Sequence, residues 1–180
     1  QYCDVLPTLL DIAGGKSSNE AFDGTSFLPV LNGKTEEHRE YVYFMHNNIP
    51  EGPAYPIRAA SNGTYTYIRN LSPENLYMEK HVMGTTRWHE YWPSCVYEAG
   101  DKEHTNFLLN RYQNRPAEEL YNLSDDPENF NNLIDDKKLK KVKKELSSKL
   151  DSWMKEQKDP GKILDQLEYE EAAKAGKHKI

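Results

Sequence analysis

The polar residues that follow the β-prone run 41–45 have side chains suited to recognising a polar ligand. His46 and Asn48 offer an imidazole and an amide that can hydrogen-bond to hydroxyl groups or to an oxyanion. Glu51, in the Pro-Glu-Gly sequence that follows, can accept a hydrogen bond from a hydroxyl or an amine. The alternative is a polar loop in which asparagines occupy turn positions. His46, Asn48 and Glu51 are therefore our candidate ligand-binding residues.

Four other residues are more typical of a structural role. Arg58 has a planar guanidinium that suits oxyanions, but it lies in a predicted strand and could equally pair with an acidic residue across a domain interface. Arg69 is similar. Tyr121 lies in a short alternating strand, and Asp126 can cap a helical turn whose first residue is Pro127. We assign Arg58, Tyr121 and Asp126 to the structure or to an interface.

Two further groups have both a binding and a structural interpretation. Three lysine pairs between residues 137 and 144 resemble a heparin-binding patch, but they alternate with Leu139 and Val142, which favours the solvated face of an amphipathic helix. Trp88, Tyr91 and Trp92 could stack on sugar rings, although aromatics at helical spacing more often pack a core or an interface.

The composition excludes several classes of protein. The 180 residues carry 23 Lys and Arg against 29 Asp and Glu, a formal net charge of -6, which argues against a general nucleic-acid binder. No apolar run is long enough to span a bilayer. The two cysteines, Cys3 and Cys95, have no metal-ligand spacing. The first residues lack an initiator Met and a signal-peptide pattern, so we expect the chain to lie inside a longer protein.

The pattern of apolar residues predicts the elements that would position these side chains. Strands are expected at 41–45, 57–60, 65–69 and 120–123, with a hairpin turn at Asn62-Gly63. Apolar residues from Leu139 to Trp153 recur at three- and four-residue spacings and predict a long amphipathic helix that ends at Asp159-Pro160-Gly161. The rest of the chain predicts shorter helices at 4–13, between 87 and 112, and at 163–175. The expected fold is α+β: a small antiparallel sheet of about four strands packed against a long C-terminal amphipathic helix.

Several segments together resemble a known family. The run 115–136 contains Glu-Leu-Tyr-Asn-Leu, then Asp-Pro, then Asn-Leu, and is similar to a pattern near the end of type I sulfatases. The segments 4–14 and 23–34 resemble the last helix of the large sulfatase domain and the loop after it. The segment 54–71, with Tyr55-Pro56-Ile57-Arg58, resembles most closely the branch that contains heparan N-sulfatase.

The resemblance implies a hydrolase of sulfate esters or sulfamates in a sulfated carbohydrate. Such enzymes use calcium and a formylglycine made from Cys or Ser in a Cys/Ser-x-Pro-x-Arg motif. Here the only matching frame begins with Ala54, and no cluster of acidic residues or histidines matches the family's metal ligands. We therefore expect no catalytic residue, no metal site and no cofactor in this chain, and no activity from the chain alone. The loop with His46 would border the substrate pocket.

The resemblance also predicts how the chain is organised. Residues 1–34 would be the last helix and loop of the upstream α/β domain, 35–158 the C-terminal subdomain, and 159–180 a charged helical tail. The expected partners are the upstream catalytic domain and the sulfated substrate, and the expected location is extracytoplasmic. Two alternatives stay open: a free-standing carbohydrate-binding module with the Trp88–Trp92 cluster as its platform, and part of another alkaline-phosphatase-superfamily hydrolase.

Overall fold

A computed structural model describes residues 1–17, 22–47, 53–84 and 91–175 of the chain. These residues fall into two compact units, Gln1–Val42 and Tyr43–Ile180, which we describe separately. Among the described residues, no helix combines the length and the apolar content that crossing a membrane requires. The elements, in chain order, are η1 (Tyr2–Asp4), α1 (Val5–Ile12), α2 (Leu28–Leu31), β1 (Val42–His46), β2 (Ile57–Ser61), β3 (Tyr65–Asn70), α3 (Lys80–Met83), α4 (Tyr91–Glu98), α5 (Glu103–Gln113), β4 (Glu118–Asn122), η2 (Lys137–Leu139), α6 (Lys140–Glu156) and α7 (Lys162–Lys174).

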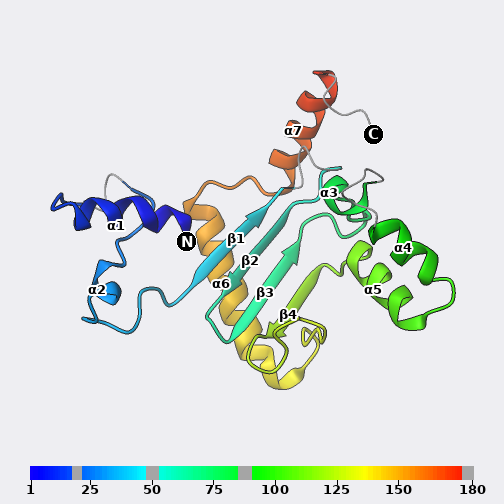
Figure 1. Ribbon diagram of the computed structural model, residues 1–180, viewed down its shortest axis with the longest axis horizontal. Helices are drawn as coiled ribbons and strands as arrows, with labels where there is room; N and C mark the ends of the chain where they lie inside the picture. The colour runs from blue at the N-terminus through cyan, green and yellow to red at the C-terminus, as the bar shows by residue number, and fades with distance from the viewer. Residues whose placement is uncertain (18–21, 48–52, 85–90, 176–180) are drawn as a thin grey trace. The chain divides into compact units, whose positions relative to one another are not determined.

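The core of the second unit is a four-stranded sheet with the sequential order β1-β2-β3-β4 (Figure 1). β2 and β3 pair antiparallel, and β3 and β4 do the same. The predicted hairpin turn lies between β2 and β3, where Gly63 has φ of 85°, a conformation that residues with a Cβ rarely adopt. Asn62 stabilises the turn because its side-chain oxygen accepts hydrogen bonds from the backbone N–H groups of Thr64 and Tyr65.

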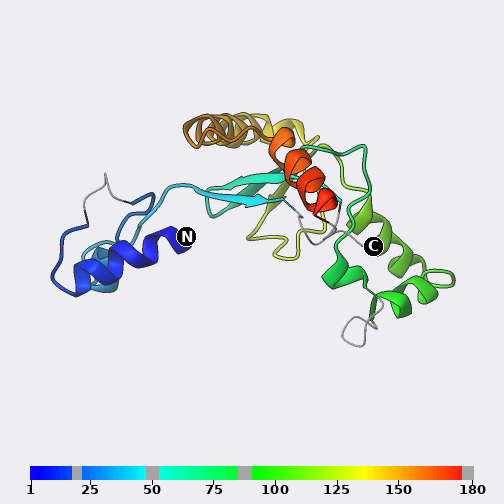
Figure 2. The ribbon, with the colours of Figure 1, turned by 90° about the horizontal axis from the view of Figure 1, so that it is seen from above.

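Helix α6 covers one face of this sheet, as predicted. It packs on β2 and β3 and lies along the sheet in Figure 2. Leu146 and Leu150 on its apolar face are fully buried, and Trp153 stacks on Tyr43 with ring centroids 5.1 Å apart. The predicted α+β fold, a small antiparallel sheet with a long helix, is therefore confirmed.

The strand register sorts polar side chains onto two faces. Arg69 pairs with Glu118 across β3 and β4, and both side chains contact α6. Arg69 donates to Asp151 at 2.6 Å, and Lys143 donates to Glu118 at 2.8 Å. Because side chains alternate along a strand, the neighbouring residues Asn70, Glu119 and Tyr121 lie on the opposite face.

In its described part, the connection from β3 to β4 holds three short helices. Two of them, α4 and α5, are separated at Gly100-Asp101, and Pro93 lies in the first turn of α4. The third, α3, was not predicted, because only four residues form it. Its cap is the side chain of Glu79, which accepts a hydrogen bond from the backbone N–H of His81 at 2.9 Å.

The prediction of a helix beginning at Pro127 is wrong. Asp126 instead closes a turn, in which Asn129 donates its backbone N–H to the Asp126 carbonyl and has φ of 56°. The Asp126 carboxylate accepts hydrogen bonds from the backbone N–H groups of Phe130 and Asn131 at 2.9 and 2.7 Å. The left-handed conformation at Asn129 stops a helix, so Asp126 orders an irregular loop before η2.

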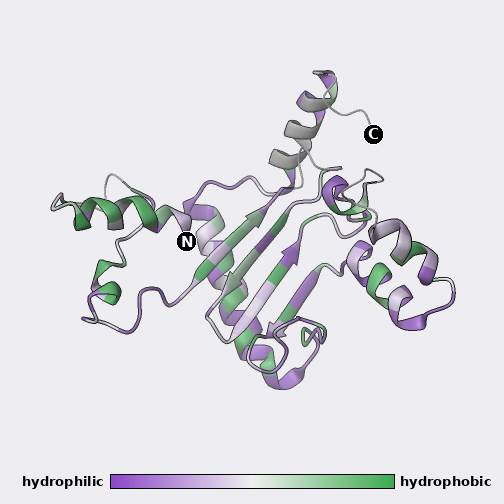
Figure 3. Ribbon diagram, viewed as in Figure 1, coloured by the Kyte–Doolittle hydropathy of each residue, from purple (hydrophilic) through white to green (hydrophobic). Residues whose placement is uncertain are grey.

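In the first unit, helix α1 is mainly apolar (Figure 3). Leu6, Leu9 and Ile12 lie one helical turn apart and are exposed. An isolated helix does not gain stability from an apolar stripe in water, so this face is suited to packing against other protein.

Candidate functional site

His46, the first candidate ligand-binding residue, lies at the end of β1 with an exposed side chain. Its Nε2 is 3.2 Å from the hydroxyl of Tyr77, and the two rings meet edge to face with centroids 5.9 Å apart. Tyr77 is buried and contacts the imidazole of His46, while that imidazole stays accessible to solvent. This arrangement fixes the orientation of a side chain that can donate or accept hydrogen bonds.

Tyr77 belongs to an aromatic cluster beside His46. Tyr55 and Tyr112 contact Tyr77 with ring centroids 5.2 and 5.3 Å away, and the guanidinium of Arg115 lies 5.2 Å from the Tyr77 ring centroid. Burial raises the pKa of Tyr55 and of Tyr77, so both hydroxyls stay protonated at neutral pH. Sequence reasoning missed this cluster, because its members come from three separate segments.

Two polar atoms of this cluster have no hydrogen-bond partner among the described residues. They are the hydroxyl of Tyr55, which is fully buried, and Nε of Arg115. A buried donor without a partner is destabilising, by about 1–3 kcal/mol for a typical group. Both atoms belong to residues that contact Tyr77, the residue that holds the imidazole of His46.

The other two candidates, Asn48 and Glu51, lie outside the described residues. The neighbouring Asn47 is described, and its side-chain oxygen accepts a hydrogen bond from Nη1 of Arg58 at 2.9 Å. Asn47 therefore holds the end of β1 to β2.

Arg58 is fully buried and engaged on every side. Its Nε and Nη2 donate to the two carboxylate oxygens of Asp159 at 2.5 and 3.1 Å. Its Nη1 donates to the carbonyl of Ile57 at 3.0 Å and to that of His46 at 3.4 Å. The hydrogen bonds from Arg58 to the Asp159 carboxylate hold the pKa of Asp159 below its ordinary value. The acidic partner belongs to the same unit, and each of the three guanidinium nitrogens donates to an acceptor of the protein itself.

Tyr121 is buried in a polar network on the sheet face opposite α6. Its hydroxyl donates to Glu119 at 2.5 Å and accepts from Nη2 of Arg111 at 3.3 Å. The second oxygen of Glu119 accepts from the side-chain amide of Asn70 at 2.7 Å. Burial, followed by the hydrogen bond to Glu119, raises the pKa of Tyr121 to about 12. The network links β3, β4 and α5.

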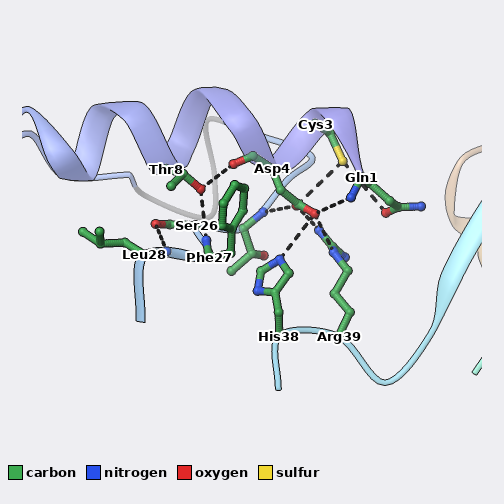
Figure 4. Close-up of polar contacts among 10 residues, drawn as sticks. Gln1, Cys3, Asp4, Thr8, Ser26, Phe27, Leu28, His38 and Arg39 are labelled. Carbon is green, nitrogen blue, oxygen red and sulfur yellow. Dashed lines mark hydrogen bonds and ion pairs between the residues drawn. The ribbon is translucent and has the colours of Figure 1, made fainter. Parts of the chain in front are cut away.

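A second buried carboxylate, that of Asp4, organises the first unit (Figure 4). It accepts hydrogen bonds from the guanidinium of Arg39 and from the backbone N–H of Thr25, the latter at 2.8 Å. Nε2 of His38 lies 3.3 Å away. Burial alone would raise the pKa of Asp4, but the hydrogen bonds from Arg39 and Thr25 outweigh it and hold that pKa well below its usual range.

Asp4 also lies at the start of helix α1. It occupies the position before α1, but its side chain makes no capping hydrogen bond. Thr8 donates its hydroxyl to the Asp4 carbonyl at 2.6 Å and accepts the backbone N–H of Phe27 at 3.0 Å. Asp4 and Thr8 thus tie α1 to the following loop.

The aromatic and lysine groups are also placed by the structure. Trp88 lies outside the described residues, whereas Trp92 packs on Tyr112 with centroids 5.4 Å apart and Tyr91 is exposed. The lysines near the start of α6 are exposed, except the half-buried Lys143, which binds Glu118.

Nothing in the described part of the chain fits a metal or a formylglycine. No group of three or more His, Cys, Asp and Glu side chains there is arranged to hold a metal ion. Ala54 occupies the position at which the formylglycine motif requires Cys or Ser. The residues present thus do not fit either group.

Comparison with known proteins identifies the origin of this fold. No protein-family profile matches the chain. An ulvan-active sulfatase of Formosa agariphila is 38% identical over 162 residues, which cover 88% of this chain and 29% of the relative.

Comparison with solved structures also finds sulfatases. A candidate sulfatase of Bacteroides thetaiotaomicron superposes with a TM-score of 0.55 at 25% identity, and the match covers 87% of this chain and 25% of the other. A 2-O GAG sulfatase superposes with a TM-score of 0.57 at 24% identity, with the same coverage of both chains. A protein solved with its substrate D-glucosamine-2-N,6-O-disulfate superposes with a TM-score of 0.54 at 19% identity, covering 87% of this chain and 24% of the other.

These matches first define the class, an α+β subdomain of the kind found in sulfatases. The chain belongs to the sulfatase family and corresponds to the C-terminal portion of its members. It spans only about a quarter of the length of the relatives it matches.

Proposed function

We propose that this chain is the C-terminal subdomain of a sulfatase that hydrolyses sulfate esters or sulfamates of a sulfated carbohydrate. The observation that carries the proposal is the 38% identity to an ulvan-active sulfatase over 88% of the chain. The substrate class follows from the relatives, whose names include ulvan, a GAG and a sulfated glucosamine. A glucosamine N-sulfate is the narrower substrate proposal, from the resemblance of segment 54–71 to the heparan N-sulfatase branch.

In this proposal the catalytic centre lies in the upstream domain, which supplies the formylglycine, made from Cys or Ser, and the calcium. Residues 1–34 complete that domain, 35–158 form the C-terminal subdomain and 159–180 form a tail. The exposed apolar stripe of Leu6, Leu9 and Ile12 supports the first assignment, because it needs a protein partner to leave water. The whole enzyme would act outside the cytoplasm.

The contribution of this chain would be one wall of the substrate pocket. His46 is accessible and oriented by Tyr77, so it can hydrogen-bond to a sugar hydroxyl or a sulfate oxygen. Asn48 and Glu51, on the loop that follows, would add polar contacts. Arg58, Tyr121 and Asp126 would hold this wall in place rather than touch the substrate, because their polar groups bond to the protein itself.

The direct test compares the longest natural chain that contains these residues with residues 1–180 alone. We expect the long chain to release sulfate from ulvan or from a sulfated glucosamine, and the 180 residues to release none. Sulfate release by residues 1–180 alone, or none by the long chain from any sulfated carbohydrate, would contradict the proposal.

The role of His46 is tested by His46→Ala in the long chain. We expect kcat/KM for the sulfated carbohydrate to fall by roughly tenfold, the size of effect typical when one polar contact to a substrate is lost. His104→Ala is the matched control, since His104 is also exposed but lies on α5. Equal effects of the two substitutions on kcat/KM would contradict a role of His46 in the substrate pocket.

A further inference from the structure

Five lysines on the solvated face at the start of α6 surround a hollow that the proposed pocket does not use. The hollow has a volume of about 530 Å³, and the residues that line it are all lysines. Figure 3 shows this end of α6 as strongly hydrophilic. The lining residues are Lys137, Lys138, Lys140, Lys141 and Lys144, and we call this feature the lysine hollow.

The lysine hollow is unfavourable for the helix that carries it. The N-terminus of a helix has a partial positive charge, so cations there are destabilising, and the first turn of α6 has no acidic residue. Lys137 and Lys141 are four residues apart, as are Lys140 and Lys144, and like charges at this spacing repel each other. Stability alone would not select this arrangement.

The ammonium groups of the five lining lysines form no ion pair in the described part of the chain. The carboxylate of Asp136 accepts a hydrogen bond from the backbone N–H of Lys138 at 2.8 Å, so it serves as a cap. Glu118 binds Lys143, which does not line the hollow, and the hydroxyl of Tyr67. The charge of the five lysines is therefore available to a ligand.

The position of the hollow relates it to the proposed pocket. Arg58 binds the carbonyl of His46 and also Asp159, which follows the C-terminal end of α6. His46 thus lies on the side of the C-terminal end of α6, whereas the lysine hollow lies at its N-terminal end. At 1.5 Å per residue, the 17 residues of α6 separate the two sites by roughly 25 Å. A ligand that reaches both must be an extended chain rather than a single sugar unit.

We propose that the lysine hollow binds sulfate groups of the polysaccharide at a distance from the unit that is hydrolysed. This inference rests on the proposed function and narrows its substrate to a polymeric sulfated chain. Ammonium groups attract sulfate as compact point charges without requiring one fixed geometry, which suits a flexible polymer. The lining contains no aromatic ring on which a base could stack, as single-stranded nucleic-acid sites commonly do.

The test measures binding of the longest natural chain to ulvan and to heparin, each compared with its desulfated form. The variant is Lys138→Gln, Lys141→Gln and Lys144→Gln together. We expect its affinity for the sulfated polymer to fall roughly 10- to 100-fold, and the slope of log affinity against log salt to fall by about two to three, because about one counterion is released per contact.

The control changes the same total charge elsewhere, with Lys16→Gln, Lys34→Gln and Lys155→Gln, all exposed lysines that do not line the hollow. We expect its affinity to stay within about twofold of the wild type, since dispersed surface charges are screened. Equal losses in both triple variants, no loss in the first, or equally strong binding of duplex DNA or of the desulfated polymer would each overturn the proposal.

Turnover separates this inference from the proposed function. The triple lysine variant should have the wild-type kcat/KM for a small sulfated sugar. Its kcat/KM should be lower than that of the wild type only for the polymer. A variant that loses both equally would refute a role at a distance. Because the binding measurement does not use turnover, it still tests the hollow if the chain proves not to be part of a sulfatase.

Discussion

Substituting Asp159 by Asn should be among the most destabilising single changes in this chain. Arg58 is 0% exposed and Asp159 is 4% exposed, and the carboxylate accepts two hydrogen bonds from the guanidinium. An Asn side chain keeps one acceptor but turns an N–H₂ group toward the second guanidinium donor. Arg58 would then carry an uncompensated charge in the protein interior. Removing one partner of such a pair typically costs about 3–5 kcal/mol.

The chain contains a matched control for this prediction. Arg69 and Asp151 form the same type of pair, at 2.6 Å, but Asp151 is 62% exposed. Exposed pairs contribute about 0–1 kcal/mol, so Asp151→Asn should cost no more than that. Urea unfolding of both variants, followed by circular dichroism, gives the two free energies of unfolding. Equal costs below about 1 kcal/mol would refute the reasoning, since the Arg58–Asp159 pair is buried and joined by two hydrogen bonds, whereas Asp151 is exposed and accepts one from Arg69.

The same pair predicts how stability depends on pH. The native pKa of Asp159 is lowered below 3.8, its ordinary value, so the stabilisation from its ionised form is complete above that value. It is lost as the pH falls below 3.8 toward the native pKa, where the carboxyl binds a proton in the folded chain. The difference in stability between the wild type and Asp159→Asn should therefore be constant near neutrality and shrink in acid. A difference that grows in acid would contradict the assignment.

Two further substitutions test the packing. Leu146→Ala should lower the free energy of unfolding by about 2–5 kcal/mol, because Leu146 is fully buried between α6 and the sheet, whereas Lys155→Ala on the exposed side of α6 should change it by less than about 0.5 kcal/mol. Gly24→Ala should destabilise the first unit, because a Cβ added at Gly24 would lie 2.0 Å from the carbonyl oxygen of Cys3. Gly100→Ala should be tolerated, because a Cβ added at Gly100 would lie 3.4 Å from its nearest neighbour, the carbonyl oxygen of Tyr97. Hydrogen exchange of the α1 amides should be faster in the first variant and unchanged in the second.

The fold was predictable because its largest elements have local signals. The spacing of Leu146, Leu150 and Trp153 predicts α6, and Asn62-Gly63 predicts the hairpin. The turn at Asp126 shows the limit of such signals. Asp followed by Pro fits a capped helix, but Asn129 adopts the left-handed conformation and the carboxylate bonds to a loop.

The site was less predictable because its contacts are distant in sequence. Arg58 could be singled out by residue type, but its partner Asp159 is 101 residues away. The same is true of Tyr77 and His46, which are 31 residues apart. Local propensity contains no information on such pairs, since only the packed sheet brings them together.

The strands pair in sequence order, but the connections between them differ in length. We therefore expect the strand pairs to form at different rates during folding. β2 and β3 are joined by three residues, so their pairing closes a very short loop. β4 joins β3 only after the 47 residues between Asn70 and Glu118, and closing the longer loop costs more chain entropy. We expect the β2–β3 hairpin to form early and β4 to join late, together with α6. Pulse-labelled hydrogen exchange during refolding would reveal this order as earlier protection of Ala60 than of Tyr121, which pairs with Thr66 of β3.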